Sequence, residues 1–447
     1  MRKICCILIK DVFERYESMK LNVKRTMLAG LSFMAISGFW AMYNSVTPLI
    51  LEKTFSLSAT LNGVVMAMDN VLAVFLLPIF GVWSDKTQTK LGKRMPFIIA
   101  GTILSILAMI LMPIADNTES LTMFMSATVA VLLFMAFYRS PAVALMPDIT
   151  PRQLRSKGNA VIMLMGTVGV IYSMITTKLL VTSDPNVKPD YLPLFIAMIV
   201  FMGISLVLME IFVDENKWEK EARKNDIPEE EEKETSHKGK LSKEKMRSLI
   251  FLLLSVAFWY MAYNGVETAL SRYTMAEWNM GPTGYTSYML IATVSAVLCY
   301  IPIGILSGKF GRKKIIMFGI AGMTIAFFTS IFFHAGGILL MLVFVLLGIS
   351  WGAINVNSFP MVVEIATDGD EGKYTGLYYM FSMVAQVLTP IFSGFLIDKT
   401  ASYKILFPYA VVFSILAFVT MSQVKHGDVV KEKYKKKSLL EHLDVDA

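Results

Sequence analysis

The sequence predicts an all-α polytopic membrane protein with twelve transmembrane helices in two six-helix pseudo-repeats. The 447-residue chain is 55% hydrophobic and only 17% charged, whereas a soluble globular chain carries about 25% charged residues. Apolar runs of ~20 residues, enough to cross a ~30 Å hydrocarbon layer as a helix, recur along it. Matching motifs appear in both halves. Within lipid, each span must be helical because no water satisfies its backbone.

The apolar runs define the expected elements in order. They predict spans at 27–51, 61–84, 97–114, 121–145, 160–181, 192–213, 249–270, 287–306, 315–333, 338–362, 375–397 and 406–421. The predicted domains are a cytosolic leader (1–25), an N-terminal bundle (26–213), a charged cytosolic linker (214–246), a C-terminal bundle (247–422) and a basic cytosolic tail (423–447). We expect the linker to be a plain tether, partly helical along the membrane surface, with a regulatory role as the alternative.

Basic residues gather in alternate short loops, and this bias predicts the orientation. One such loop holds Lys86, Lys90, Lys93 and Arg94, while the opposite loops hold few cations. Short loops rich in Lys and Arg stay on the cytoplasmic side. We therefore expect both termini in the cytoplasm. The net charge of +7 is explained by these loops, so it predicts no nucleic-acid partner.

The two halves carry a similar motif at the same relative place. The first span contains Phe39-Trp40-Ala41-Met42-Tyr43-Asn44-Ser45-Val46, and the seventh contains Phe258-Trp259-Tyr260-Met261-Ala262-Tyr263-Asn264-Gly265-Val266. Internal repeats of this kind are typical of transporters whose two bundles surround a shared cavity.

Polar residues near the middle of the second span mark a candidate site. Asp69 and Asn70 lie there, and a carboxylate at bilayer depth costs at least a few kcal/mol unless it faces protein or water. Such a carboxyl group can bind and release a proton, or ligate Na⁺ together with neighbouring oxygens such as those of Asn70 and Asn62. The alternative is a hydrogen bond between helices that only fixes packing.

Two further charged residues fall within predicted spans. Glu267 and Asn264 lie three residues apart and share one helix face, and a carboxylate with an amide suits sugar hydroxyls. The alternative for Glu267 is a wetted acid near the interface. Arg139 should pair with an acid or with backbone carbonyls; its alternative is snorkelling towards the cytoplasmic surface.

Several aromatic and amide side chains could complete a binding site. Aromatic faces can stack on the apolar face of a sugar ring while amides hold its hydroxyls. Each of these residues alone is more often a packing residue. The candidates are Tyr43, Asn44, Trp351, Asn355 and Gln386.

The basic loop after the second span also holds an acid. We expect Asp85 to cap the start of a neighbouring helix and to pair with Arg94 or Lys93, so that breaking this pair frees the bundles to rock. The alternative is a loop that only sets topology, which would not explain the acid.

These motifs resemble those of a known group. The motif G-x-x-S-D-K at 81–86 with G-K-R at 92–94 resembles the loop motif of the major facilitator superfamily. The longer stretches SDKTQTKLGKRMPFI, SPAVALMPDITPRQLRSKGNA and EGKYTGLYYMFSMVAQVLTPIFSG are similar to bacterial relatives of the sucrose carriers and of the glycoside–pentoside–hexuronide cation symporters. The resemblance implies sugar uptake with a co-transported proton or sodium ion. It departs in the fourth span, where Leu132 or a neighbour stands at the position of the acid that is thought to carry the proton in plant sucrose carriers.

We therefore expect a secondary active importer of a disaccharide or glycoside, driven by proton symport, in the plasma membrane. In this hypothesis Asp69 and Glu267 take the ion. The alternatives are a sodium-coupled glycoside symporter, an exporter of another amphipathic solute, or a transport-inactive sensor on the same fold. No Gly-rich phosphate-binding loop indicates that ATP drives transport, and no nucleophile-and-base set within the spans indicates an enzyme. We expect no cofactor beyond the co-transported ion, no metal, a sugar and the lipid bilayer as partners, and a monomer.

Overall fold

The computed structural model describes residues 21–151, 154–182, 184, 187–225, 242–365 and 371–427. Parts of the predicted leader, linker and tail (1–20, 226–241 and 428–447) lie outside these residues. The elements are α2 (Val23–Lys53), α3 (Ala59–Lys86), α4 (Met95–Met109), α5 (Leu111–Asn117), α6 (Leu121–Asp148), α7 (Arg155–Leu180), α8 (Leu192–Phe212), α9 (Glu215–Asn225), α10 (Lys243–Glu277), α11 (Gly284–Phe310), α12 (Arg312–Ser330), α13 (Ile338–Ile365), α14 (Glu371–Thr400), η2 (Tyr403–Ile405) and α15 (Leu406–Ser422).

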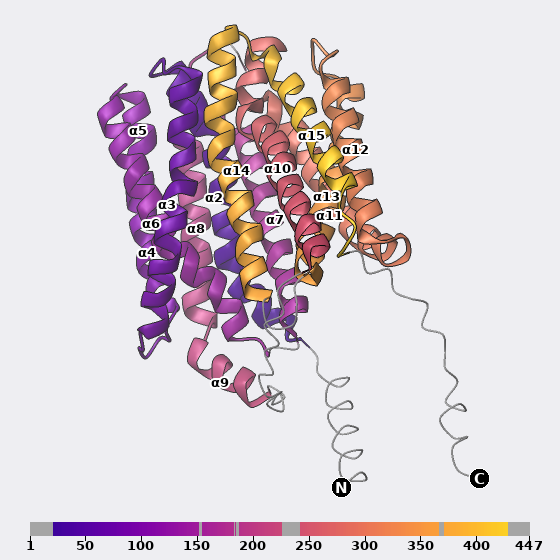
Figure 1. Cartoon of the computed structure of the whole chain (residues 1–447). Helices are drawn as coiled ribbons and strands as arrows, with labels where there is room; N and C mark the ends of the chain where they lie inside the picture. The colour runs from indigo at the N-terminus through magenta and orange to yellow at the C-terminus, as the bar shows by residue number, and fades with distance from the viewer. Residues whose placement is uncertain are drawn as a thin grey trace, which may run out of the picture. The chain divides into compact units, whose positions relative to one another are not determined.

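Helices long and apolar enough to cross a membrane number twelve in the described part of the chain, which confirms the predicted spans (Figure 1). Most helices extend a few residues beyond the predicted limits. The seventh span differs most in length, because α10 begins six residues before and ends seven residues after the predicted limits. The third span consists of α4 and α5 with a break at Ile110. Many of the extra residues are polar or charged, so hydrophobicity alone does not reveal that the helices continue through them.

The chain forms two compact units. Unit 1 comprises Met1–Thr235, Glu267–Leu290 and Pro390–Tyr403, and unit 2 comprises Ser236–Val266, Ile291–Thr389 and Lys404–Ala447. Helices α10, α11 and α14 contribute to both units. The predicted bundle boundaries at 213 and 247 stay a prediction.

Local sequence signals explain where several helices begin. The side chains of Asn22, Ser58 and Ser120 accept hydrogen bonds from backbone N–H groups in the first turns of α2, α3 and α6. These residue types are favoured at helix N-caps because their short side chains reach the unpaired donors. Helix α8 instead begins with a proline in its first turn, where the missing N–H costs nothing.

The first part of the predicted linker forms helix α9, which is the largest difference between the predicted and the observed structure. It lies across the end of the α4 and α8 ribbons rather than along them (Figure 1). Trp218 and Ala222 are buried, and Glu215 is fully buried. The exposed side chains of α9 with defined burial are all basic: Lys217, Lys220, Arg223 and Lys224. Residues 215–225 are therefore a docked amphipathic helix. The expectation that the linker is partly helical is confirmed for them, whereas a plain tether would not be docked by buried side chains.

Candidate functional site

Asp69 belongs to a cluster of polar side chains from α2, α3 and α6 in unit 1. The Asn70 amide nitrogen donates a hydrogen bond of 2.8 Å to Asp69 Oδ1. Asp69 also interacts electrostatically with Arg139 of α6 and with Tyr43 of α2. Asp69 and Arg139 attract each other without forming a direct ion pair. The structure therefore brings together four of the predicted site residues.

Two buried hydrogen-bonding groups lie beside this cluster. The Trp40 indole nitrogen and the Tyr43 hydroxyl are buried, and neither has a hydrogen-bond partner in the described structure. The Arg139 guanidinium lies over the Trp40 ring, 5.8 Å from its centroid, and the Trp40 and Tyr43 rings meet edge to face at 5.5 Å. Buried polar groups in proteins nearly always make a hydrogen bond. The unpaired indole N–H and hydroxyl groups are therefore available to form hydrogen bonds with a ligand. Trp40 is a site residue that the sequence analysis does not predict, although it belongs to the motif that recurs in the seventh span.

Pro48 shapes α2 next to the cluster. Proline has no N–H, so the backbone carbonyl of Asn44, one turn earlier, loses its usual helical donor. Asn44 itself is half-buried and no described residue pairs with its side chain. Asn62, a possible sodium ligand beside Asp69, instead donates 2.8 Å to the Pro48 carbonyl. The Asn62 amide nitrogen therefore ties α3 to α2, whereas its buried amide oxygen has no hydrogen-bond partner in the described structure, and its predicted role beside Asp69 stays a prediction.

Glu267 lies in α10 and is half-buried. Within the described residues its carboxylate makes no hydrogen bond and no ion pair. An ionised carboxylate in such a place is costly without a partner, so Glu267 fits a group that is protonated or meets a ligand.

The predicted site residues of unit 2 lie on α10, α13 and α14. The Tyr263 and Trp351 rings stack with centroids 3.8 Å apart and planes 7° apart, so each covers one face of the other. Asn355 donates to the Trp351 carbonyl at 3.1 Å, and Gln386 donates to the Ser382 carbonyl at 3.2 Å. Asn264 is buried. Each repeat thus joins an aromatic residue of its first span to its fourth span, Trp40 to α6 and Tyr263 to α13.

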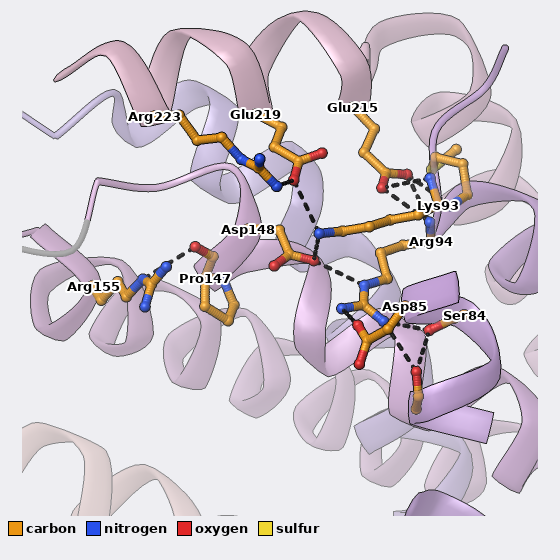
Figure 2. Close-up of polar contacts among 12 residues, drawn as sticks. Ser84, Asp85, Lys93, Arg94, Pro147, Asp148, Arg155, Glu215, Glu219 and Arg223 are labelled. Atoms are coloured by element: carbon orange, nitrogen blue, oxygen red, sulfur yellow. Dashed lines mark hydrogen bonds and ion pairs between the residues drawn. The ribbon is translucent and has the colours of Figure 1, made fainter. Parts of the chain in front are cut away.

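A network of charges occupies the end of unit 1 that holds the basic loop (Figure 2). Arg94 Nε donates to Asp148 Oδ2 at 2.8 Å, and its two terminal nitrogens bind Asp85 and Ser84. The Arg94 side chain is only 6% exposed, whereas that of Asp85 is 57% exposed. Burial opposes the charge of Arg94, but Asp148 and Asp85 outweigh it and raise the pKa of the guanidinium. The predicted pairing of Asp85 with Arg94 is present.

Helix α9 completes this network. Lys93 Nζ lies 3.2 Å from Asp148 and 2.9 Å from Glu219, which also binds Arg223. Burial disfavours the ionised form of Glu219, but Lys93 and Arg223 outweigh it and lower the pKa of the carboxyl group.

Glu215 caps the start of α4. Glu215 accepts the backbone N–H groups of Lys93, Arg94 and Met95 at 2.9–3.0 Å. The side chain of Arg94, at the N-cap, makes no capping bond itself, so Glu215 takes the role expected of Asp85. Burial raises the pKa of Glu215 although these N–H groups act in the opposite direction. Gly92, at φ +113°, leaves room for this carboxylate, because a Cβ there would overlap it.

The fold and these motifs agree with comparisons to known proteins. The sequence profile described as Major Facilitator Superfamily matches residues 28–301 and 252–441. The chain belongs to this superfamily. It is therefore a multi-pass membrane protein of a transporter superfamily rather than an enzyme, and the predicted resemblance to sucrose carriers is confirmed.

Similar curated proteins include plant sucrose carriers. Sucrose transport protein SUC3 of Arabidopsis thaliana is 27% identical over 166 residues, which are 33% of this chain and 27% of that protein. Sucrose transport protein SUT3 of Oryza sativa subsp. japonica is 23% identical over 210 residues, 39% of this chain and 40% of that protein. The uncharacterized MFS-type transporter YfkL of Bacillus subtilis is 25% identical over 146 residues, 33% and 36% of the two chains. Each match thus spans less than half of the relative's length.

Solved structures with the same fold cover nearly the whole chain. The inward open xylose transporter XylE from E. coli has a TM-score of 0.64 at 14% identity, covering 94% of this chain and 98% of that one. A mutant form of the nucleoside transporter NupG has a TM-score of 0.64 at 16% identity, covering 90% of this chain and 100% of that one. At these identities the likeness concerns the fold alone.

Proposed function

We propose that this protein imports a disaccharide or another glycoside, of the sucrose or maltose type, by proton symport with alternating access. The observation that carries the proposal is the half-buried Asp69–Arg139 cluster, with the unpartnered Trp40 and Tyr43 groups beside it, in a member of the major facilitator superfamily. The partial similarity to plant sucrose transport proteins supports the sugar as substrate.

The proton step uses the attraction between Asp69 and Arg139. While Asp69 is ionised, it holds the Arg139 charge and the Asn70 amide towards itself. A proton on Asp69 removes that negative charge, so the guanidinium and amide N–H groups become free to donate to sugar oxygens. Loss of the proton after reorientation restores the attraction and displaces the sugar. Glu267 is the second carboxyl group proposed to carry a proton.

Sugar recognition needs both donors and apolar surface. In unit 1, Trp40, Tyr43, Asn70 and Arg139 offer N–H and O–H donors, and the Asn44 carbonyl offers an acceptor. A sugar ring presents hydroxyl groups around its edge and C–H groups on its faces, so this mixture suits it. Predicted sugar contacts in unit 2 are Asn264, Trp351, Asn355 and Gln386.

The donors around Asp69 favour a proton over sodium. Sodium sites in transporters use unwound backbone carbonyls. The groups that act directly on Asp69 are an amide N–H and a guanidinium, although the Asn44 carbonyl freed by Pro48 lies near the cluster. The Asn62 amide nitrogen is bonded to the Pro48 carbonyl, and its amide oxygen, which has no hydrogen-bond partner in the described structure, is the ligand atom that the sodium alternative would use. Coupling to sodium is therefore the second candidate.

The orientation follows from exposed cations. Lys86, Lys90, Lys217 and Lys220 are exposed at the end of unit 1 that holds the Arg94 network, and we propose that this end faces the cytoplasm. Both termini then lie in the cytoplasm, and the membrane is the plasma membrane. Asp85, Lys93 and Arg94 stiffen the cytoplasmic end of the first repeat and act as its gate. A monomer suffices for this cycle.

Transport by the purified protein in proteoliposomes tests the proposal. An inward proton gradient without sodium should drive accumulation of labelled sucrose or maltose, and unlabelled glycosides should compete. Accumulation that needs sodium and ignores the proton gradient would support the sodium symporter instead. Transport of the solute in the outward direction only would indicate an exporter. Sugar binding without exchange of labelled for unlabelled sugar across the membrane would indicate a sensor.

A further inference from the structure

Helix α9 docks through one face and leaves its opposite face exposed. Glu215, Trp218 and Ala222 are buried, and the half-buried Glu221 pairs with Arg25. The exposed side chains of α9 with defined burial form what we call the basic face of α9: Lys217, Lys220, Arg223 and Lys224. The three lysines make no ion pair within the described part of the chain, so their charges are available to an anion.

A cavity of about 380 Å³ lies between the basic face of α9 and the loop that joins α3 to α4. Lys220 and Arg223 line it from α9, and Thr87 and Gln88 line it from the loop. The Asn216 amide nitrogen holds the loop in place, since it donates to two backbone carbonyls of the loop at 2.9 and 3.3 Å. Sites for small molecules have similar or larger volumes, so a ligand of several heavy atoms fits here.

Cations outnumber acids around this cavity. Both acids of the lining already have partners, because Asp85 binds Arg94 and Glu219 binds Lys93 (Figure 2). Among the described lining residues, Lys220 therefore keeps an unpaired charge. A cation beside hydroxyl and amide groups suits a phosphate group, whose oxygens accept several charge-assisted hydrogen bonds at once.

Apolar side chains next to the cavity place it at the membrane surface. Trp83, near the end of α3, is 56% exposed, and its ring meets those of Phe97 and Phe137 edge to face. Tryptophan is typical of the interface where lipid tails give way to headgroups. Phe212, at the end of α8, is also exposed, and α9 lies across that end of α8 (Figure 1). The basic face, which begins with Lys217, therefore follows directly on a lipid-facing surface.

We propose that the basic face of α9 and the adjoining cavity bind the headgroup of an anionic phospholipid. Its phosphate binds at Lys220 and Arg223, and its acyl chains lie along the exposed apolar side chains at the ends of α3 and α8. A zwitterionic headgroup fits less well, because its own cation would meet the cations of α9. A soluble phosphate ester has no acyl chains and gains nothing from the apolar surface. The bound lipid holds α9 against the membrane, whichever solute the protein carries.

Lipid binding to the full-length protein in detergent tests this site. Native mass spectrometry measures the dissociation constant of the first bound dioleoylphosphatidylglycerol, which is anionic, and of dioleoylphosphatidylcholine, which is zwitterionic. Each cation near an anionic surface strengthens binding about fivefold. The triple variant Lys217→Gln, Lys220→Gln, Lys224→Gln should therefore bind phosphatidylglycerol about 100-fold more weakly. Its thermal midpoint should stay that of the parent protein, because the three side chains are exposed.

A matched variant separates this site from basic segments in general. Lys245→Gln, Lys309→Gln, Lys314→Gln removes three exposed lysines of unit 2 that also make no ion pair within the described residues. It should keep the phosphatidylglycerol affinity of the parent protein. Equal weakening in the two triple variants, an unchanged affinity in the α9 variant, or equal binding of the two lipids by the parent would overturn the proposal.

Two other occupants of the basic face have outcomes of their own. Binding of glycerol 3-phosphate as tight as that of phosphatidylglycerol would assign the cavity to a soluble phosphate ester instead. The acidic run 229–232 of the same linker lies outside the described residues. A rise in phosphatidylglycerol affinity of fivefold or more after its four glutamates are changed to Gln would assign the basic face to that run.

Discussion

Replacement of Glu215 by Gln tests whether α9 is part of the transporter or merely tethered to it. Glu215 and Gln have the same shape, so the change leaves no cavity. The native carboxylate accepts the N–H groups of Lys93, Arg94 and Met95 through its two oxygens. In the variant an amide NH₂ replaces one oxygen, so at least one of these N–H groups faces another donor.

The expected magnitude follows from that lost bond. A hydrogen bond to a charged group contributes about 1.5–3 kcal/mol, and Glu215 is fully buried, so solvent does not replace it. A loss of ~2 kcal/mol lowers the ratio of docked to undocked α9 about 30-fold. Burying the native Glu215 charge is costly, as its raised pKa shows. The Gln variant avoids that cost, so the loss of ~2 kcal/mol in docking free energy is an upper estimate.

Hydrogen exchange in nanodiscs measures this ratio directly. The amides of residues 93–95 and of α9 should exchange up to about 30-fold faster in Glu215→Gln, because exchange from a docked segment requires local opening. The control is Glu221→Gln on the same helix, which loses a partly exposed ion pair with Arg25 that contributes at most ~1 kcal/mol. Equal exchange in the parent and Glu215→Gln, or equal acceleration in both variants, would refute the reasoning.

Four further predictions concern the Arg94 network with α9 and the polar cluster around Asp69. Gly92→Ala should undock α9 as strongly as Glu215→Gln, since its positive φ and the space of its missing Cβ are both needed; slow exchange at 93–95 in this variant would count against it. Arg94→Lys keeps the charge but cannot reach Asp85, Ser84 and Asp148 together, so the thermal midpoint should fall by several degrees, while Arg155→Lys at an exposed site should not change it. Lys93 and Arg223 lower the pKa of Glu219 in the docked state. The ionised carboxylate therefore stabilises the docking of α9 above an ordinary carboxyl pKa of ~4.3, and this stabilisation is lost as the pH falls through the lowered pKa. The mobility of a spin label on α9 should rise in acid, and Glu219→Gln should remove this pH dependence. Trp40→Phe should raise KM for the sugar about fivefold, the value of one hydrogen bond of ~1 kcal/mol, without loss of stability, because the indole nitrogen has no protein partner; an unchanged KM would remove Trp40 from the site.

The spans and the Asp85–Arg94 pair could be predicted because their signals are local. Each span is a run of apolar residues whose length the bilayer dictates, and Asp85 lies within ten residues of Arg94. The clustering of Asp69, Arg139 and Tyr43 was harder to predict from the sequence, because it depends on which faces of α2, α3 and α6 meet. The repeated FW…YN motif did indicate the importance of Trp40, which was not included among the predicted site residues.

Contacts between distant segments account for most of what the sequence analysis missed. Glu215 lies more than 100 residues from the α4 N-terminus that it caps, and Asp398 lies more than 300 residues from Ala59, whose backbone N–H it accepts. A composition argument treated the linker as uniformly charged, whereas the spacing of Glu215, Trp218, Glu219 and Ala222 at three and four residues predicts one helix face. This spacing of three and four residues is the feature of the sequence that predicts α9.

The central claim is that Asp69 couples proton movement to sugar movement, and the transport kinetics of Asp69→Asn test it most directly. In proteoliposomes with an inward proton gradient, the variant should lose uphill accumulation of the sugar and keep sugar exchange at equilibrium, because a neutral side chain resembles the protonated state. Asp190→Asn, a capping carboxylate elsewhere in the first repeat, should keep both activities. Uphill accumulation by Asp69→Asn at the rate of the parent protein would contradict the account.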